Sequence, residues 1–265
     1  MLKLHQTGDW GEGDVDVQWV RSGRAVVPEV EAMIGRAWAE ATAKPGMHLF
    51  DGPMCRMERW EVSPDGTRLE LALSHTSYKV FWGTNLSHPH LAGRHGPSVM
   101  ANPVGVSPAL ETADGYLLLG RRSGSVAYYP NRVHPFAGAL EPDDDGDLFA
   151  AVRRELDEEL SLRGDEVAEV RCTGIVEDEN LRQPELIFRA RSTLTRGEIE
   201  WRLDPVEHHD TYPVRATAGD VEHAIVDPLL TPVAVASLLL WGRWRFGDAW
   251  FDLTWERRVK AGFTR

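Results

Sequence analysis

Three glutamates and one arginine lie close together near the middle of the chain. Glu158 and Glu159 follow Glu155 by three and four residues, and Arg154 directly precedes it. On a helix this spacing brings the carboxylates together, where they repel one another unless a positive charge lies among them. Oxygen ligands favour Mg²⁺, with Mn²⁺ as the alternative, and such ions bridge to substrate phosphates. The segment therefore indicates a divalent metal site, in which Arg154 can orient a carboxylate.

A helix has to position these side chains. Asp147 is a suitable N-cap because its carboxylate can accept the free amides of a first turn, and the helix should end near residue 160. Four apolar residues recur on one face of this helix: Leu148, Val152, Leu156 and Leu160. Glu159 projects within this apolar face, Glu155 lies at its edge, and Glu158 lies further round. An ordinary acidic helix is the alternative, because Glu and Arg are common helix formers.

The run from Arg154 to Glu159, preceded by Gly138, resembles the Nudix box. That motif reads Gly, five residues, Glu, seven residues, then Arg-Glu-apolar-any-Glu-Glu-any-Gly-apolar, and its charged core is complete here. Two departures occur. Gly138 lies two residues too far from Arg154, so the first Glu of the motif falls on Asp144 or Gly146, and the last Gly is Ser161. Asp144, Asp145 or Asp147 could stand in for the missing glutamate.

The resemblance extends to other segments, in the order seen in a Nudix branch that includes animal UDP-glucose pyrophosphatases and a plant relative. It covers about residues 28–195 and is carried by residues 49–53, 76–78, 83–85, 102–106 and 121–123. The fold that it implies is a Nudix α/β/α sandwich with a mixed sheet, with an N-terminal α+β lobe packed on it. We expect residues 1–99 to form the lobe and residues 100–265 the Nudix domain with C-terminal helices.

The resemblance also implies an activity. It suggests Mg²⁺-assisted hydrolysis of a nucleoside diphosphate linked to another group, with a UDP-sugar such as UDP-glucose giving a nucleoside monophosphate and a sugar 1-phosphate. One alternative is a degenerate domain that binds a nucleotide sugar without cleaving it. Another keeps the chemistry but changes the substrate to ADP-ribose, dinucleotides or damaged nucleotides.

Roles for individual residues follow from the resemblance. Glu155, Glu158 and Glu159 would bind the metal, and the carbonyl of Ala137 would complete the site. Arg154 would orient a glutamate. Arg122 and Arg121, at a strand end, would be phosphate ligands. Glu185 would be the general base. Glu179, Glu177 or a glutamate of the box are the alternatives for the base.

Residues 75–85 contain many aromatic and hydrogen-bonding side chains. Tyr78 and Asn85 in this segment could belong to a base- or sugar-binding wall. Aromatic side chains that close a hydrophobic core are the alternative. The four tryptophans at positions 241, 244, 250 and 255 are expected in a core or a subunit interface.

Charge and composition restrict the partners. The formal charge of -12 argues against a general nucleic-acid binder, which needs clustered Lys and Arg. Cys55 and Cys172 have no metal-ligand spacing and suit a reducing cytoplasm better than a disulfide. The first residues lack the apolar stretch of a signal peptide, and the most apolar run, 233–241, is too short to span a bilayer. We expect a cytoplasmic protein without a membrane or nucleic-acid partner, and a homodimer is one option for its assembly.

The other elements are expected from periodicity and turn signals. A helix is predicted over residues 28–43, and a hairpin over residues 56–62 and 68–73. Four further strands are predicted at 104–110, 116–119, 170–176 and 185–191. Helices are expected from Thr231-Pro232 to about 245 and over 248–260, whereas residues 1–27 and 198–221 show no clear period.

Overall fold

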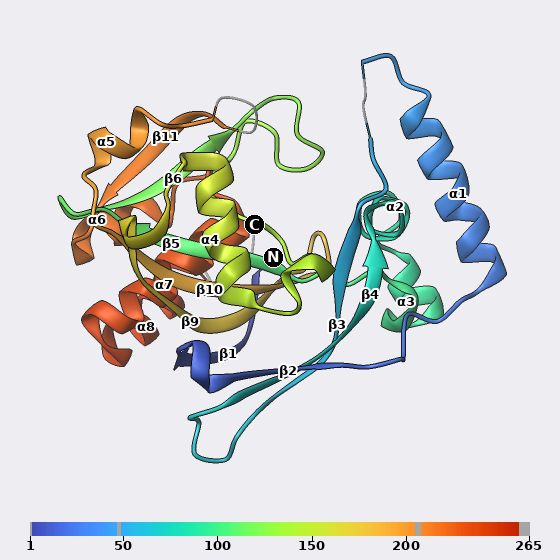
Figure 1. The fold of residues 1–265 in the computed structure, drawn as a ribbon, viewed down its shortest axis with the longest axis horizontal. Helices are drawn as coiled ribbons and strands as arrows, with labels where there is room; N and C mark the ends of the chain where they lie inside the picture. The colour runs from blue at the N-terminus through green and yellow to red at the C-terminus, as the bar shows by residue number, and fades with distance from the viewer. Residues whose placement is uncertain (1, 47–48, 205–207, 260–265) are drawn as a thin grey trace.

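The computed structural model describes residues 2–46, 49–204 and 208–259, which build a large mixed sheet and a small second sheet (Figure 1). The large sheet has the strand order β1-β9-β10-β5-β6-β11, with β7 paired to β6 and β8 paired to β5. Its strands are β1 (Leu2–Trp10), β5 (Gly105–Glu111), β6 (Tyr116–Arg122), β7 (Val133–His134), β8 (Gly138–Ala139), β9 (Val167–Asp178), β10 (Gln183–Ser192) and β11 (His208–Arg215). Strands β5 and β10 are parallel and the other pairings are antiparallel, so the sheet is mixed, as predicted.

Helices cover both faces of this sheet. The apolar face of α4 (Leu148–Leu160) packs with alternate residues of the central strands, among them Val106, Leu118 and Leu186. Helix α7 (Pro232–Phe246) packs on the opposite face, against residues such as Ala109 and Ile187. Helices α6 (Ala218–Ala224) and α8 (Asp248–Thr254) lie beside α7. The chain therefore has the α/β/α sandwich expected of a Nudix domain.

The smaller part of the molecule contains the three-stranded sheet β2-β4-β3 and short helices (Figure 1). Its elements are β2 (Val15–Trp19), α1 (Pro28–Thr42), β3 (Pro53–Val62), β4 (Leu69–Ser77), α2 (Tyr78–Phe81), a π-helical turn (Trp82–Leu86) and α3 (Leu91–His95). The predicted helix over 28–43 and the predicted hairpin are confirmed. Strand β1 lies at the edge of the large sheet, although the sequence analysis placed residues 1–99 in the lobe. The boundary at residue 99 stays a prediction.

Two segments contain more regular structure than predicted. The first 27 residues form β1 and β2, and the segment 198–221 contains the end of α5 (Arg196–Glu200), β11 and the start of α6. Strand β11 is an edge strand with a largely exposed, polar sequence, so it lacks the alternation of a half-buried strand. Its hydrogen bonds to β6 stabilise it, and those bonds depend on the tertiary fold.

The C-terminal helices agree well with prediction. Thr231 caps α7 by accepting a hydrogen bond from the amide of Ala234. Trp241, on the same helix, is buried in the core. Trp244 is partly exposed and carries the guanidinium of Arg189 4.2 Å from its ring centroid. The predicted helix over 248–260 extends through α8 and a π-helical turn to residue 259, and Lys260 lies outside the described residues. Both cysteines are free and buried. Among the described residues, no helix is both long and apolar enough to cross a membrane.

Candidate active site

Helix α4 forms as its sequence predicts. The Asp147 carboxylate accepts the amides of Phe149 and Ala150, both at 2.9 Å, and thereby satisfies two of the free donors of the first turn. The four apolar residues of the predicted face are all buried: Leu148, Val152, Leu156 and Leu160. Burial of this face orients the helix, so the positions of its acidic side chains follow from packing.

The three glutamates of α4 lie in different environments. Glu155 and Glu159 are buried, at 7% and 5% exposed, whereas the side chain of Glu158 is 59% exposed. The Glu155 carboxylate lies against Gly138, where a Cβ atom would come within 2.2 Å of Oε1. Gly138 is therefore required for space, since any side chain there would displace this carboxylate.

Arg154 connects these acids to the loop before the helix. Its guanidinium donates to Glu155 Oε1 at 2.7 Å and to Glu158 Oε2 at 3.4 Å. It also bonds both oxygens of Asp144 at 3.2 Å and the carbonyl of Ala139 at 3.2 Å. Burial opposes the charge on Arg154, but these anionic partners outweigh it and raise the pKa of the guanidinium. Asp144 thus contacts the arginine from the loop in which the motif has its first glutamate.

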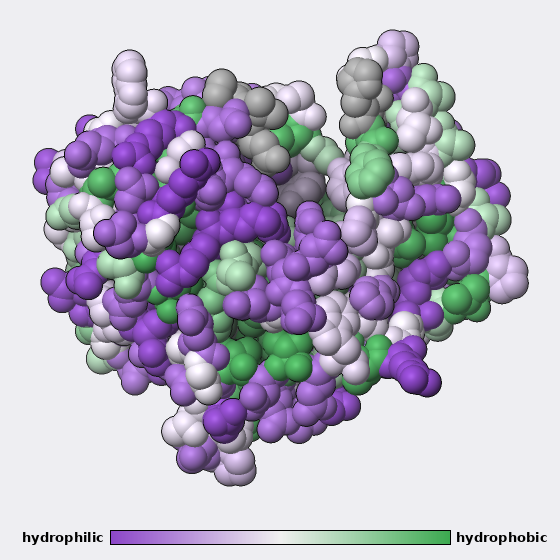
Figure 2. Space-filling view, viewed as in Figure 1, coloured by the Kyte–Doolittle hydropathy of each residue, from purple (hydrophilic) through white to green (hydrophobic). Residues whose placement is uncertain are grey.

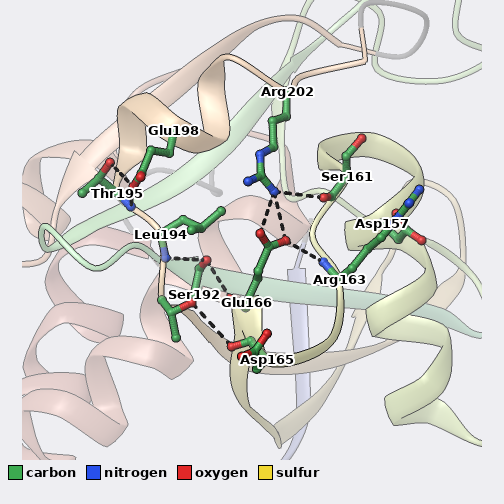
Figure 3. A network of polar contacts seen from close by, with 11 residues as sticks. Asp157, Ser161, Arg163, Asp165, Glu166, Ser192, Leu194, Thr195, Glu198 and Arg202 are labelled. Carbon is green, nitrogen blue, oxygen red and sulfur yellow. Dashed lines mark hydrogen bonds and ion pairs between the residues drawn. The ribbon is translucent and has the colours of Figure 1, made fainter.

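The C-terminal end of α4 is fixed by a polar network (Figure 3). Ser161 adopts the left-handed conformation with φ 53°, at the position where the motif has glycine. Arg202 donates to the Ser161 carbonyl at 3.3 Å and to both oxygens of Glu166 at 2.9 Å. The amide of Asp204 bonds the carbonyl of Glu159 at 2.9 Å. These contacts hold the last turn of the helix in place without the glycine.

The acidic residues have the right chemistry for a divalent metal, because their carboxylates supply the oxygen ligands that Mg²⁺ prefers. The Glu155 carboxylate occupies the space over Gly138. However, in the described part of the chain no three His, Cys, Asp or Glu side chains converge as a metal site. Arg154 pairs with Glu155 and Glu158, so a metal would compete with this guanidinium for the same oxygens.

Arg122 is the last residue of β6 and lies opposite His208 of β11. It is buried, and its guanidinium carbon lies 4.8 Å from the ring centroid of Tyr128. Burial, and then the charge of Arg122, lowers the pKa of His134 and of His208, and the same charge opposes the rise that burial causes in the pKa of Glu185. Within the described residues Arg122 forms no ion pair, and its Nε atom has no hydrogen-bond acceptor. A buried guanidinium in this state indicates room for an anionic ligand.

His208 at the start of β11 is fully buried beside the acidic helix. Its Nδ1 atom lies 3.8 Å from Glu159 Oε2, and the ring stacks edge-on against Phe136 with centroids 5.0 Å apart. Burial, and then the charge of Arg122, lowers the pKa of His208 to about 4, so the ring is neutral at pH 7. The sequence does not distinguish this residue as a candidate, since its segment shows no regular period.

Glu185 on β10 is buried on the opposite face of the sheet from Glu155. Its carboxylate lies over Gly105 and accepts a hydrogen bond from Ser107 at 3.1 Å. In the pairing of β5 with β8, Gly105 faces Ala139 and Val106 faces Gly138, and successive residues point to opposite faces. Burial raises the pKa of Glu185 to about 8. Glu185 is therefore not part of the α4 cluster, although the charge of Arg122 reaches it.

A cavity of about 320 Å³ lies between the two parts of the molecule. The smaller part contributes Phe50, Tyr78 and Phe81 to its wall, among others, and the large-sheet part contributes Tyr128, Ala139, Glu141 and Gln183. The outline of the molecule is hollowed between these two parts (Figure 2). Because Tyr128 contacts Arg122 and the Ala139 carbonyl contacts Arg154, the cavity adjoins the charged cluster.

Of the predicted substrate ligands, some lie at the cavity or next to it and others lie elsewhere. Tyr78 lines the cavity, as the predicted wall requires. Asn85 does not: it is 1% exposed and its amide binds the carbonyls of Leu181 and Arg182, so its role is structural. Arg121 points to the opposite face from Arg122, where its charge acts on Tyr212.

The remaining predicted residues lie apart from the α4 cluster or next to it. Glu177 on β9 forms a hydrogen bond with His5 of β1 at 3.0 Å. Glu179 is exposed in the turn that follows β9. Ala137 directly precedes β8 and is buried. Tyr128 was missed, although its aromatic neighbourhood, Tyr128-Tyr129 after the two arginines, was visible in the sequence.

Several known proteins are similar to this chain in sequence. No protein-family model matches the sequence. The human protein named uridine diphosphate glucose pyrophosphatase NUDT22 is 27% identical over 255 residues, covering 83% of this chain and 84% of that protein. Its bovine counterpart is 26% identical over 230 residues, covering 74% and 79%. The mouse protein of that name is 33% identical over 130 residues, covering 45% of this chain and 42% of the relative.

Solved structures with a similar chain include DR0079 from Deinococcus radiodurans, with 21% identity and a TM-score of 0.40, covering 51% of this chain and 80% of that one. Another is the Nudix domain of Shewanella oneidensis NrtR complexed with ADP ribose, with 16% identity and a TM-score of 0.40, covering 60% and 98%. The charged motif on α4 and the sequence relatives support the Nudix hydrolase superfamily as the class of this chain. The human and bovine NUDT22 proteins are two relatives that match most of its length.

Proposed function

We propose that this Nudix hydrolase is a Mg²⁺-dependent pyrophosphatase that splits a UDP-sugar, UDP-glucose in the first instance, into UMP and a sugar 1-phosphate. The names of the human and bovine relatives support this substrate. The observation that carries the proposal is the position of Arg122. This buried guanidinium lies over Tyr128 of the cavity wall and on the same face of the sheet as His208, the neighbour of Glu159, and its Nε atom is free of any described acceptor.

The cavity and the neighbouring Arg122 suit two parts of such a substrate, the uracil ring and the diphosphate. Its volume of about 320 Å³ lies within the range of small-molecule sites, roughly 300–1,000 Å³. Tyr78, Tyr128 and the largely exposed Phe50 offer aromatic surface on which a uracil ring can stack. Arg122, next to Tyr128, would then bind the diphosphate, because a guanidinium matches phosphate oxygens in charge and geometry.

Glu155, Glu158 and Glu159 would hold Mg²⁺ together with the carbonyl of Ala137. When bound, the ion would polarise the phosphate oxygens and lower the pKa of a coordinated water. Arg154 holds Glu155 and Glu158 through its guanidinium, which keeps these two side chains close to each other. Asp144 in turn orients Arg154.

In the reaction, the oxygen of a water molecule forms a bond to one phosphorus atom and the anhydride P–O bond breaks. The proton of the water has to reach a base. Glu185 lies on the opposite face of the sheet from the α4 cluster, so the proposed acceptor is a glutamate of the motif on α4. Arg122 would stabilise the negative charge that develops on the phosphate.

The direct test is to incubate the purified protein with UDP-glucose and Mg²⁺ and to separate the products by anion-exchange chromatography. We expect UMP and glucose 1-phosphate in equal amounts, and no products with the Glu159→Gln variant. In H₂¹⁸O, the phosphate that carries the label identifies the phosphorus that water attacks. A panel with ADP-ribose, a dinucleotide and an oxidised nucleotide should give lower kcat/KM values. Binding of UDP-glucose without release of UMP, with either Mg²⁺ or Mn²⁺, would contradict the proposal.

A further inference from the structure

We propose that His208 is a positioning residue for Glu159, whose carboxylate it orients through Nδ1–H for binding the metal ion. This inference rests on the proposed function, because Glu159 is assigned there as a metal ligand. It concerns a residue of β11, far from the Nudix motif in the sequence.

A β-bulge directs His208 toward the acidic helix. In the pairing of β11 with β6, His208 lies opposite Arg122 and Asp210 lies opposite Arg121, so His209 is an extra residue between them. With regular alternation, His209 would face α4 and His208 would face the other side of the sheet. The bulge reverses this, and His208 shares the face of Gly120 and Arg122.

The imidazole ring occupies a closely fitted position. It lies over Gly120, where a Cβ atom would come within 2.2 Å of the ring carbon Cδ2. Phe136 contacts it edge-on, with an interplanar angle of 65°. The ring therefore has little freedom to turn, and its Nδ1 atom points to Glu159 Oε2 at 3.8 Å. This separation is about 1 Å longer than a hydrogen bond.

The ring nitrogens of His208 also lack partners. Neither Nδ1 nor Nε2 forms a hydrogen bond with any residue that the structure describes. Most buried polar atoms in proteins have a partner, because an unsatisfied one costs about 1–3 kcal/mol. A small movement of the Glu159 carboxylate would give Nδ1–H an acceptor. Carboxylates that bind metals are themselves hydrogen-bonded, and loss of such a bond typically weakens metal affinity about 10- to 100-fold.

The experiment compares two substitutions that differ in one donor. His208→Asn keeps an N–H close to the position of Nδ1, whereas His208→Leu has a similar size and no donor. The same pair at the exposed neighbour, His209→Asn and His209→Leu, serves as the control. The readout is the Mn²⁺ dissociation constant of the substrate-free protein, measured by electron paramagnetic resonance. We expect His208→Leu to raise it about 10- to 100-fold, His208→Asn to raise it less than about threefold, and both His209 variants to leave it unchanged.

Wild-type Mn²⁺ affinity in His208→Leu would overturn the proposal, and so would equal losses in the Leu and Asn variants, which would indicate that only ring packing matters. The Glu159→Gln variant distinguishes failure of the role of His208 from failure of the proposed metal site. If it also binds Mn²⁺ normally, the proposed metal site itself is wrong. Circular dichroism establishes that each variant is folded. If His208→Leu is not, the ring ¹⁵N resonances of the wild-type protein still decide, since the Nδ1 resonance should shift on Mg²⁺ saturation and an unchanged resonance would contradict the assignment.

Discussion

The carboxylate of Glu155 lies against the backbone of Gly138, 17 positions earlier in the chain, where a Cβ atom would come within 2.2 Å of Oε1. The backbone conformation at Gly138 does not require glycine, because its φ is not positive. The absence of a side chain at this position is thus explained by the carboxylate it accommodates. The glycine of the motif leaves room here for the Glu155 carboxylate.

A Gly138→Ala substitution should therefore act on the site more than on the fold. The added methyl group must displace the Glu155 carboxylate, and overpacking of this kind costs about 1–3 kcal/mol. We expect UMP release to fall at least about tenfold while the protein stays folded. Gly35→Ala in α1 is the control, because a Cβ atom there meets nothing within 4 Å. Equal activity of the two variants would show that the position of Glu155 is unimportant.

Substitution of the acids tests the metal site directly. Glu158→Gln and Glu159→Gln should each lower kcat about a hundredfold or more, because the amide is a poor ligand for a divalent ion. Asp157→Asn is the matched control, because Asp157 lies on the same helix and its carboxylate pairs with the exposed Arg163. Steady-state kinetics with UDP-glucose and Mg²⁺ measure the effect. If Glu158→Gln retains full activity, the exposed glutamate is not a ligand and only the buried pair remains.

Arg122 should contribute mainly to substrate binding. Removal of a charge-assisted hydrogen bond to phosphate costs about 1.5–3 kcal/mol, which corresponds to a KM increase of roughly 10- to 100-fold for Arg122→Ala. Arg121→Ala provides the control because that arginine points to the other face of the sheet. The comparison of KM values is informative even if both variants lose some stability. Similar KM values for the two variants would remove Arg122 from the proposed site.

Tyr128 tests whether the cavity between the two parts binds the nucleoside. Loss of a stacking ring costs roughly 1–3 kcal/mol, so Tyr128→Ala should raise KM for UDP-glucose about 5- to 100-fold. Tyr116→Ala is the control, since it also lies beneath arginines, Arg196 and Arg215, but at the other end of β6. Isothermal titration with UMP should show the same difference. Unchanged UMP affinity in Tyr128→Ala would place the base elsewhere.

Glu185 predicts a pH dependence of stability. It lies on the opposite face of the sheet from the α4 cluster, so we expect it to make no contribution to the pH profile of kcat/KM. Its pKa is higher in the folded protein than in the unfolded chain, where it is near 4.5. The folded protein therefore binds the proton more tightly, and the stability from this group, present below pH 4.5, is lost as pH rises toward 8. Glu185→Gln should abolish this dependence, as seen in urea unfolding at several pH values, and should leave the pH profile of kcat/KM as in the wild-type protein. A pH profile of kcat/KM that Glu185→Gln alters would show that Glu185 acts in the reaction.

The sequence by itself determined the acidic helix and its chemistry. Three local patterns indicate this helix: the Asp147 cap, the four-residue apolar repeat and the Arg-Glu core. Each of them depends on residues within a few turns of one helix. The same holds for α1, α7 and most central strands, whose alternation or apolar runs follow from burial of one or both faces. These features could be predicted because neighbours in sequence decide them.

Only the tertiary structure decided which distant side chains meet this helix. Arg122 and Arg121 are adjacent in sequence, yet strand alternation sends them to opposite faces, and a single bulged residue turns His208 inward in place of His209. The burial of Asn85 and the cavity between the two parts depend in the same way on how separate segments pack. Register and bulges are set by pairings between strands far apart in the chain, which no local pattern of residues records.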